Sequence, residues 1–165
     1  MFIESEERDA WLQLSDEALF KLCRHDFFKA QGNGGQKRNK TSNAIRLVFL
    51  PADQLTVSDC SGRSQHDNRK QALMKLRREI AIKIRSGTSQ LELPLEMSVN
   101  NRQYPLWTAM MLDRLHRHGF DVKAAAQESG ASPSRLLKLI ARDPGLWQFM
   151  NQCREKNALL TLKTP

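Results

Sequence analysis

Three glycines lie within residues 32–35, between two stretches of the chain that have the character of strands. Glycine has no Cβ and adopts positive φ readily, so this cluster predicts a loop whose backbone can approach another surface closely. Residues 44–50 alternate between apolar and polar side chains and are expected to form the strand that leaves the loop. Residues 26–31 are expected to form the strand that enters it. The chain is therefore constrained to place two strands on either side of a glycine-rich connection.

The glycine-rich stretch continues into a basic one that contains Lys37, Arg38 and Lys40. Over its 165 residues the chain has a formal net charge of +8 and a pI near 9.8. Positive charge on a loop of this kind indicates a polyanionic partner, nucleic acid above all. A basic soluble protein without such a partner is the alternative that charge alone leaves open.

Local patterns extend the fold on both sides of these strands. Ser15 is a candidate N-cap for a short helix that runs to about Cys23. Residues 51–53 form a turn, and residues 55–58 a short returning strand. A long helix follows, because apolar residues recur there at helical spacing. Its core stripe is Leu73, Leu76, Ile80 and Ile84.

The other faces of this long helix are basic, with only Asp67 and Glu79 opposing the positive charges. Such a run is either a solvated helix face or a contact with RNA, and the sequence leaves both readings open. The basic residues are Arg63, Arg69, Lys70, Lys75, Arg77, Arg78, Lys83 and Arg85.

The second half of the chain is predicted to be a linker and a helical unit. Residues 87–104 contain the helix breakers typical of a linker. Helices are then expected over residues 105–118 and 132–142, where Ser132 is the N-cap and Pro133 takes the first position. The two other expected helices begin at Asp121 and at Pro144.

The spacing of Ala126 and Gly130 in this unit resembles helix-turn-helix DNA-binding domains. Small helical units of this kind also contact RNA or serve only as packing modules, and all three readings stay open. Trp107 and Trp147 are expected in the core. The rings of His116 and His118 diverge on a helix, so we expect no metal site there.

The cysteines indicate a reducing compartment. Cys23, Cys60 and Cys153 are odd in number and far apart, with the spacing of neither a zinc site nor a disulfide framework. No apolar run is long enough to cross a bilayer, and the acidic N-terminal residues do not resemble a secretory signal. We expect a cytoplasmic protein with no membrane partner, no metal and no cofactor.

Two motifs, in this order, resemble the class I peptide-chain release factors. Gly34-Gly35-Gln36 resembles the family's catalytic loop, and Arg63-Ser64-Gln65-His66 with Asn68 resembles the signature that opens its long helix. The resemblance covers about residues 14–86. Further matches to the loop are Gly32, Asn39-x-Thr41 and Ala44-Ile45-Arg46, and two segments are closer to the short ribosome-rescue peptidyl-tRNA hydrolases of that family, Lys29-Ala30-Gln31-Gly32 and Asn39-Lys40-Thr41-Ser42.

The resemblance implies an α/β (α+β) fold: a small, mainly antiparallel sheet with a long helix packed on it and the Gly-Gly-Gln loop projecting from one end. A small all-α, helix-turn-helix-like domain is expected to follow. The expected parts of the chain are an N-terminal extension over 1–13, a release-factor-like catalytic domain over 14–86, a linker over 87–104 and the helical domain over 105–160.

The resemblance also implies catalytic roles for Gly34, Gly35 and Gln36. In the family this loop enters the ribosomal peptidyl-transferase centre and promotes attack of water on the ester that joins the nascent peptide to tRNA. The glycines would let the backbone N–H of Gln36 face the oxyanion that forms during ester hydrolysis, while the Gln36 side chain selects and orients water. Gln36 is in addition a candidate for N-methylation by a glutamine methyltransferase.

The partners that the resemblance implies are the ribosome, through its large-subunit rRNA, and peptidyl-tRNA. Contacts with RNA are expected from the basic and amide side chains around the two motifs. These candidates are Lys29, Lys37, Arg38, Lys40, Arg46, Arg63, Gln65, Arg69 and Lys70.

The chain departs from the family in two ways. Lys37 and Arg38 stand where the family usually has a histidine or similar residue and then valine, which should make rRNA contact more salt-dependent. Full-length release factors also have domains that read stop codons, for which this chain has no room, and residues 159–165 do not resemble the basic tail of the rescue hydrolases. We therefore expect a monomeric peptidyl-tRNA hydrolase that rescues stalled ribosomes without reading a codon. The alternatives are a non-enzymatic nucleic-acid-binding regulator that uses the helical domain, and a factor that binds free tRNA or rRNA precursors.

Overall fold

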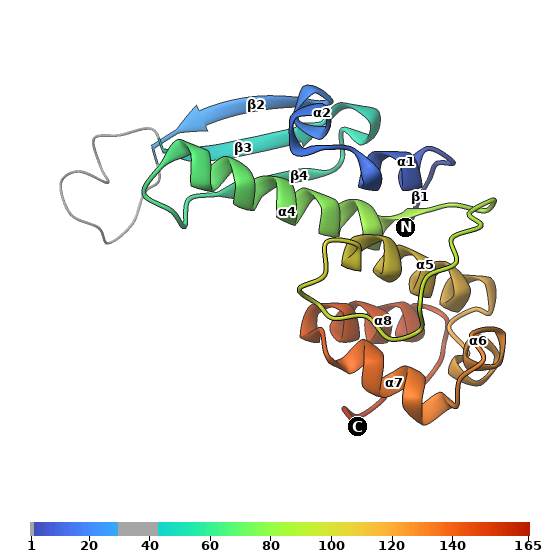
Figure 1. Ribbon diagram of the computed structural model, residues 1–165. Coiled ribbons are helices and arrows are strands. Elements are labelled where there is room, and N and C mark those ends of the chain that lie inside the picture. Colours follow the sequence, from blue (N-terminus) through green and yellow to red (C-terminus); the bar gives the residue numbers. More distant parts are fainter. Residues whose placement is uncertain (1, 30–42) are drawn as a thin grey trace. The chain divides into compact units, whose positions relative to one another are not determined.

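The computed structural model describes residues 2–29 and 43–165 of the chain (Figure 1). The chain divides into two compact units. The sheet unit is Ala10–Ile80, and the helical unit combines Met1–Asp9 with Ala81–Pro165. Two helices, α1 (Arg8–Gln13) and α4 (Gln65–Lys83), have residues in both units.

The sheet unit contains a three-stranded antiparallel sheet in the order β2-β3-β4, which confirms the small antiparallel sheet predicted from the sequence. The strands are β2 (Cys23–Phe28), β3 (Ala44–Phe49) and β4 (Thr56–Asp59). A short 3-10 turn, η1 (Leu50–Ala52), connects the last two.

Alternation of side chains gives β3, the middle strand of the sheet, one buried face. Ile45, Leu47 and Phe49 are completely buried on one face of the strand, as their spacing of two predicts. The apolar stripe of α4 is buried as well, at Leu73, Leu76 and Ile80. Lys75 of α4 bonds the carbonyl of Ser58 in β4, which fixes the long helix beside the sheet.

The short helix α2 (Asp16–Lys21) begins where the sequence predicts, because the hydroxyl of Ser15 accepts a hydrogen bond from the backbone N–H of Ala18 at 3.2 Å. The next strand differs from the prediction. β2 begins at Cys23, three residues before the expected start at Asp26, because Cys23 still pairs with Phe49 and both side chains are buried.

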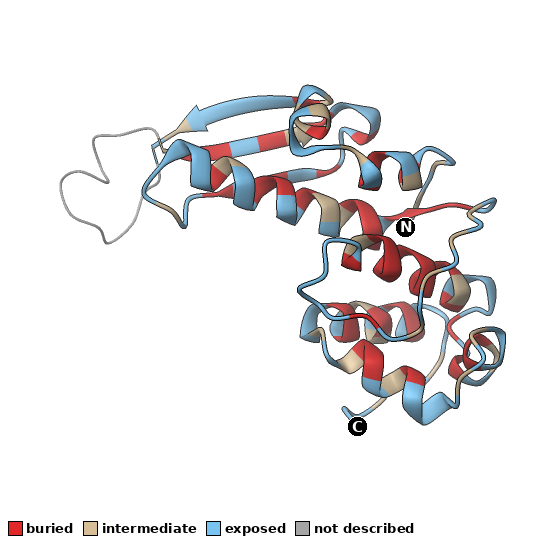
Figure 2. Cartoon of the chain, viewed as in Figure 1, coloured by how far each residue is buried: buried red, intermediate tan, exposed pale blue. Residues whose placement is uncertain are grey.

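The helical unit is built from α5 (Tyr104–Arg117), α6 (Val122–Glu128), α7 (Pro133–Ala141) and α8 (Pro144–Lys156). Figure 2 shows that α5 is buried along most of its length. The two expected core residues, Trp107 and Trp147, are 1% and 8% exposed. A helical region after the sheet is therefore confirmed.

The caps of these helices follow the local sequence. Asp121 accepts from the N–H of Lys123 at the start of α6, and Ser132 accepts from the N–H of Arg135 at the start of α7. Gly130, in the turn between them, has a φ of +62°, which a side chain would disfavour.

The first residues of the chain belong to the helical unit. β1 (Ile3–Glu4) pairs in parallel with β5 (Ile84–Arg85). Arg8 donates to Asp113 at 2.6 Å, and Arg85 donates to the other oxygen of the same carboxylate at 2.9 Å. We call Arg8, Arg85 and Asp113 the arginine–aspartate cluster; all three side chains are at least 96% buried.

The segment between β5 and α5 contains no helix or strand, as its composition predicts. It nevertheless packs on the helical unit. Met97 is buried, and the indole N–H of Trp107 donates to the carbonyl of Leu95 at 3.0 Å. Among the residues that the structure describes, no helix is both long and apolar enough to cross a membrane.

Candidate functional site

The predicted catalytic residues Gly34, Gly35 and Gln36 lie outside the residues that the structure describes. The same holds for three of the expected RNA contacts, Lys37, Arg38 and Lys40. What the structure gives is the base of this segment, where β2 ends and β3 begins.

The two ends of the segment leave from neighbouring strands. Phe28, the last residue of β2, pairs with Ala44, the first residue of β3. Antiparallel partners lie about 5 Å apart, so the two residues that bound the connection are neighbours at one end of the sheet. Lys29 and Asn43 are the described residues that flank it.

A buried amide holds one of these ends. The side chain of Asn68, in the first turn of α4, is completely buried. Its Nδ2 donates to the carbonyl of Asn43 at 2.7 Å and to that of Gly62 at 3.2 Å, while its Oδ1 accepts from the N–H of Gly62 at 2.6 Å. Because a carboxamide has both donors and acceptors, it satisfies backbone groups of both kinds at once.

A second amide crosses in the opposite direction. Asn43 Nδ2 donates to the carbonyl of Arg63 at 2.8 Å. The side chain of Asn43 thus bonds the backbone just before α4, and the side chain of Asn68 in α4 bonds the backbone of Asn43. We call Asn43, Gly62 and Asn68 the base clamp. It ties the first described residue after the glycine-rich segment to the start of the long helix.

Gly62 is required in the base clamp by space. A Cβ at this position would lie 2.9 Å from Asn68 Oδ1 and 3.1 Å from the Cβ of Asp67. Any side chain would therefore displace the Asn68 amide from the backbone groups that it bonds.

Ser64 gives the second motif a local explanation. Its hydroxyl accepts from the backbone N–H of Asp67 at 3.0 Å and donates to the Asp67 carboxylate at 2.7 Å. This is the pattern of a capped helix N-terminus, and the acidic Asp67 in the first turn complements the helix dipole. The Arg-Ser-Gln segment thus starts α4 where its first turn can reach Asn43.

The structure places the remaining expected RNA contacts at the surface of the sheet unit. Arg69 is half-buried, with its guanidinium 3.7 Å from the centre of the Phe20 ring, and Arg46 lies 5.4 Å from the Phe28 ring. Both arginines keep a charge beside an aromatic face, an arrangement that restrains the guanidinium. The exposed candidates are Lys29, Arg46, Arg63, Gln65 and Lys70.

Other basic residues of α4 have structural roles. Arg77 donates to the carbonyls of Leu12 and Leu14 and to the carboxylate of Asp16. Arg85, which the sequence placed on the same helix, instead lies in β5 and is buried in the arginine–aspartate cluster. The excess of positive charge that the sequence shows along this helix therefore overstates the charge available to a partner.

Lys75 forms an ion pair with Asp59. Its Nζ lies 2.7 Å from Asp59 Oδ2, and the N–H and hydroxyl of Ser61 donate to the other carboxylate oxygen. Burial alone would raise the pKa of the Asp59 carboxyl, but the hydrogen bonds from Lys75 and Ser61 outweigh it and hold the pKa below its usual value.

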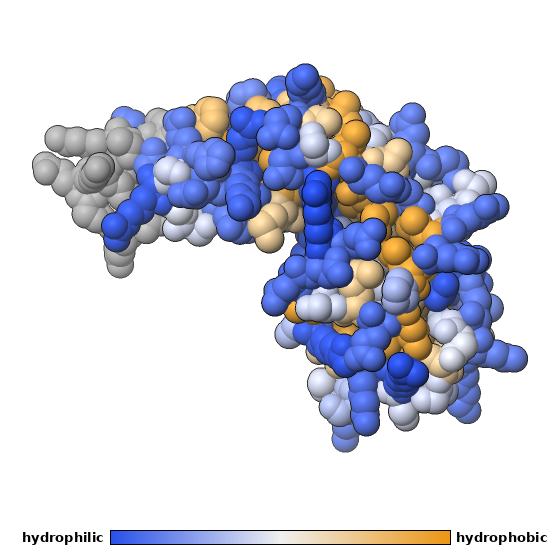
Figure 3. All heavy atoms as spheres, viewed as in Figure 1, coloured by the Kyte–Doolittle hydropathy of each residue, from blue (hydrophilic) through white to orange (hydrophobic). Residues whose placement is uncertain are grey.

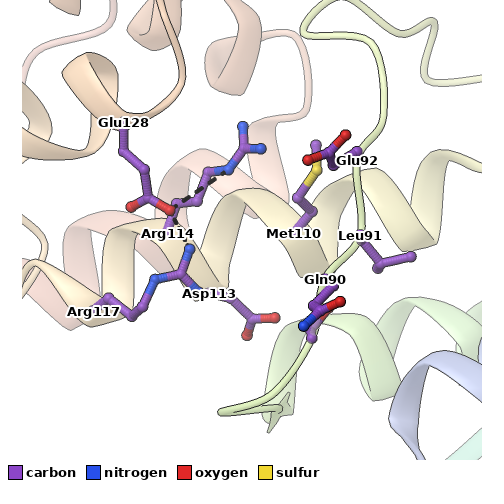
Figure 4. Close-up of a pocket in the computed structure, with 9 residues that line it drawn as sticks. Gln90, Leu91, Glu92, Met110, Asp113, Arg114, Arg117 and Glu128 are labelled. Atoms are coloured by element: carbon purple, nitrogen blue, oxygen red, sulfur yellow. Dashed lines mark hydrogen bonds and ion pairs between the residues drawn. The ribbon is translucent and has the colours of Figure 1, made fainter.

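The helical unit has a polar hollow of about 460 Å³ (Figure 4). Three of its charged groups are paired with one another, since the carboxylate of Glu128 contacts both Arg117 and Arg114. Of the predicted RNA contacts that the structure describes, none lines this hollow. Its lining consists of Ser89, Gln90, Leu91, Glu92, Met110, Asp113, Arg114, Arg117 and Glu128.

Comparison with known proteins adds independent support for the resemblance. A family model described as the RF-1 domain matches residues 17–103, just over half of the chain. This range contains the Gly-Gly-Gln segment and the base clamp, and it ends before α5.

Three relatives illustrate the extent of the match. The chain is 45% identical over 73 residues to peptide chain release factor 1 of Paracidovorax citrulli, covering 44% of this chain and 20% of that protein. For the protein of the same name from Ruthia magnifica the identity is 50% over 54 residues, covering 32% and 14%. For that of Lachnoclostridium phytofermentans it is 40% over 74 residues, covering 45% and 19%. The chain spans about a fifth or less of the length of these relatives.

Proposed function

Because the chain belongs to the RF-1 domain family, we propose that it is a release-factor-like peptidyl-tRNA hydrolase that acts on the ribosome. The observation that carries the proposal is the family match over residues 17–103, which includes both motifs found in the sequence. The partners in this proposal are large-subunit rRNA and peptidyl-tRNA.

In the proposed reaction, water attacks the carbonyl carbon of the ester between the nascent peptide and the tRNA ribose. The tetrahedral intermediate carries an oxyanion, to which the backbone N–H of Gln36 donates. The ester C–O bond then breaks, the ribose oxygen takes a proton, and the peptide leaves as a carboxylic acid. Gly34 and Gly35 allow the backbone turn that aims this N–H.

The base clamp supports this mechanism because catalysis by a main-chain donor depends on position. A loop that carries a reacting group needs a fixed point of departure, and small errors of placement lower the rate strongly. From the protein interior, Asn68 donates one hydrogen bond to the carbonyl of Asn43 at that point, and two further hydrogen bonds join its amide to the backbone of Gly62.

We further propose that the hydrolase acts without a codon, as a rescue factor for stalled ribosomes. The support is the resemblance of Lys29–Gly32 and Asn39–Ser42 to the short rescue hydrolases. Within this proposal the helical unit, most of which lies beyond the family match, anchors the protein to the ribosome.

A peptide-release assay tests both parts of the proposal. Ribosomes carrying labelled peptidyl-tRNA are prepared in three states: with an mRNA that ends in the P site, with a sense codon in the A site, and with a stop codon in the A site. Release on the truncated mRNA, with no preference for the stop codon, is the expected result. Release only with the stop codon would replace rescue by termination, and the absence of release in every state would contradict the hydrolase.

The proposed modification of Gln36 is tested on protein purified from native cells. Mass spectrometry of protein from native cells should show a methyl group on the peptide that contains Gln36. An unmodified peptide would remove the methyltransferase from the proposed partners.

A further inference from the structure

We infer that the solvent face of α7 binds the phosphate backbone of RNA, and that Glu96 occupies the position of a phosphate in the unbound protein. This inference rests on the proposed function, because the ribosome makes RNA the polyanion that the helical unit would meet. We call Ser134, Arg135, Lys138 and Arg142 the α7 face; all four residues are exposed.

The α7 face results from the amphipathic pattern of the helix. Leu136, Leu139 and Ile140 are buried in the core of the helical unit. Arg135 and Lys138 are three residues apart, and Arg142 follows four residues later, so the three cations lie along one side of the helix.

The element that presents these cations is held firmly. The Ser132 hydroxyl caps the start of α7, and Pro133 takes its first position. At its other end the chain passes directly into α8, where Asp143 caps the next helix through the N–H groups of Gly145 and Leu146. Charged side chains on a capped, packed helix make a defined surface for a partner.

Glu96 shows what kind of group this surface binds. Its Oε1 lies 2.6 Å from Arg142 Nη2, and its Oε2 lies 3.7 Å from Arg135 Nη2. One carboxylate thus joins two guanidinium groups, and the hydrogen bond from Arg142 is the main cause of the lowered pKa of Glu96. Guanidinium groups also bind the oxygens of phosphate groups through charge-assisted hydrogen bonds.

An external anion can replace Glu96. The side chains of Glu96, Arg135 and Arg142 are 54%, 58% and 48% exposed, so solvent reaches all three. Exposed ion pairs of this kind are weak. A backbone phosphodiester carries the same single negative charge as a carboxylate, but an RNA strand presents many such groups in succession and releases counterions when it binds. Lys138, on the same face, would contact a second phosphate of the same strand.

The local charge of α7 suits an anionic occupant, and the proposed action on the ribosome makes RNA that occupant. The whole helical unit contains thirteen arginine and lysine residues and eleven aspartate and glutamate residues, whereas residues 133–142 contain three cations and no carboxylate. Figure 3 shows hydrophilic side chains over much of the visible surface of this unit. A surface with this sign of charge suits a long polyanion, whose binding releases counterions and depends on salt.

The test measures equilibrium binding of the full-length protein to purified ribosomes, to a short RNA duplex and to the DNA duplex of the same sequence, over a series of salt concentrations. Arg135→Ala with Arg142→Ala should weaken binding to ribosomes and to the RNA duplex. It should also lower the slope of log affinity against log salt by about one for each phosphate contact removed. Lys163→Ala, which removes an exposed cation of the same unit outside the α7 face, is the matched control and should change neither value much.

Glu96→Gln separates phosphate mimicry from a purely structural ion pair. If Glu96 competes with RNA, removing its charge should tighten RNA binding by roughly two- to fivefold, the affinity equivalent of an exposed ion pair. If the ion pair only fastens residues 87–103 to α7, the substitution lowers the melting temperature and leaves RNA affinity unchanged, which would overturn the inference.

Three further outcomes are decisive. Wild-type affinity of the double arginine variant for ribosomes and RNA would refute the α7 face. Tighter binding to the DNA duplex than to the RNA duplex would favour a DNA-binding regulator instead, and weaker ribosome binding with unchanged RNA-duplex binding would indicate a protein partner. Peptide release at saturating protein is measured separately. If the α7 variants bind more weakly but release peptide at the wild-type maximal rate, the inference is supported. If the wild-type protein binds RNA but releases no peptide, only the proposed hydrolase activity is contradicted.

Discussion

Asn68 lies where the pattern of α4 calls for an apolar side chain. It precedes Ala72, Leu76 and Ile80 at intervals of four residues, and all four side chains are completely buried. A buried carboxamide in a core stripe is stable only because backbone groups satisfy it. Asn68 was noticed in the sequence as part of a motif, but its partners Asn43 and Gly62 were not predicted, because both contacts join residues separated along the chain.

Replacing Asn68 by alanine should impair both folding and catalysis. The substitution leaves the carbonyl of Asn43 and the N–H and carbonyl of Gly62 without partners, so we expect a loss of about 2 kcal/mol in the free energy of unfolding. We also expect slower peptide release at saturating protein, because the base of the proposed catalytic segment is no longer fixed. Urea unfolding and single-turnover release measure the two effects.

Gln71→Ala is the matched control for this prediction, since Gln71 is an exposed residue of the same helix. It should behave as wild type in both assays. A normal release rate in a folded Asn68→Ala protein would show that the base clamp has no part in positioning the segment.

At the proposed catalytic residues, backbone and side chain have separable effects. Gly35→Ala should lower peptide release by on the order of a hundredfold or more, because a Cβ prevents the turn that aims the oxyanion donor. Gln36→Ala keeps its N–H, so it should lose less rate and more selectivity for water over hydroxylamine. Both products are quantified in a single-turnover release reaction.

Gly87→Ala controls for a generic effect of replacing glycine, since a Cβ there would lie at an ordinary 3.7 Å from Glu6 Oε1. Its release rate should equal that of the wild type. Equal rates for Gly35→Ala, Gln36→Ala and the wild type would exclude these residues from catalysis.

At the scale of elements, local chemistry explains what could be predicted from the sequence. The alternation of Ile45, Leu47 and Phe49 was enough to place β3, and the hydroxyls of Ser15 and Ser132 were enough to place the starts of α2 and α7. These patterns depend on residues within a few positions of one another. The parallel pairing of β1 with β5 joins residues about eighty positions apart, and no local pattern indicates it.

In the candidate site, too, the features that depend on local sequence could be predicted and those that depend on distant residues could not. The Gly-Gly-Gln and Arg-Ser-Gln motifs could be read from the sequence because each is a short string of residues. The reason for the spacing of the two motifs could not be read from the sequence. It lies in the hydrogen bond from the side chain of Asn68 to the carbonyl of Asn43, the first described residue after the glycine-rich segment. The sequence left open whether the basic residues of the long helix form a solvated face or an RNA contact. It could not show that Lys75, Arg77 and Arg85 have partners within the protein, because those acidic and carbonyl groups are distant in sequence.

The pairing of Lys75 with Asp59 predicts how the stability of the sheet unit depends on pH. The pKa of Asp59 is lowered in the folded protein, so the pair stabilises the fold fully above the ordinary aspartate pKa of about 3.9. This contribution is lost as the pH falls from there through the lower, folded pKa. Urea unfolding between neutral and acidic pH should show the decrease.

Lys75→Met keeps the length of the side chain and removes the charge, so it should reduce stability at neutral pH and flatten this part of the pH profile. An unchanged profile in Lys75→Met would show that another carboxylate causes the acid sensitivity.

At the scale of the whole molecule, the arginine–aspartate cluster joins the beginning of the chain to its second half. Arg8 and Arg85 share the carboxylate of Asp113, and burial lowers the pKa of Arg85 to about 10, so it remains charged at neutral pH. Two buried guanidinium groups would be poorly compensated without Asp113. The cluster therefore makes the stability of the helical unit depend on residues that the sequence placed in an N-terminal extension.

Asp113→Asn tests that dependence. The substitution keeps the shape of the side chain and removes its charge, and we expect a loss of about 3 kcal/mol or more in the free energy of unfolding. Glu155→Gln, at an exposed acidic position of α8, should change stability little. Equal stability of the two variants in chemical denaturation would show that the buried arginines are compensated in another way.

The pairing of Ile3 with Ile84 and of Arg8 with Asp113 has a consequence for the order of events during translation. Ile3 can find its partner only after Ile84 has been synthesised, and Arg8 only after Asp113, whereas Ala10–Ile80 has its own strands and core at an earlier stage. Domains generally fold as units while they emerge from the exit tunnel. The half of this protein that is proposed to hydrolyse peptidyl-tRNA is therefore complete before the half that contains both chain termini can close.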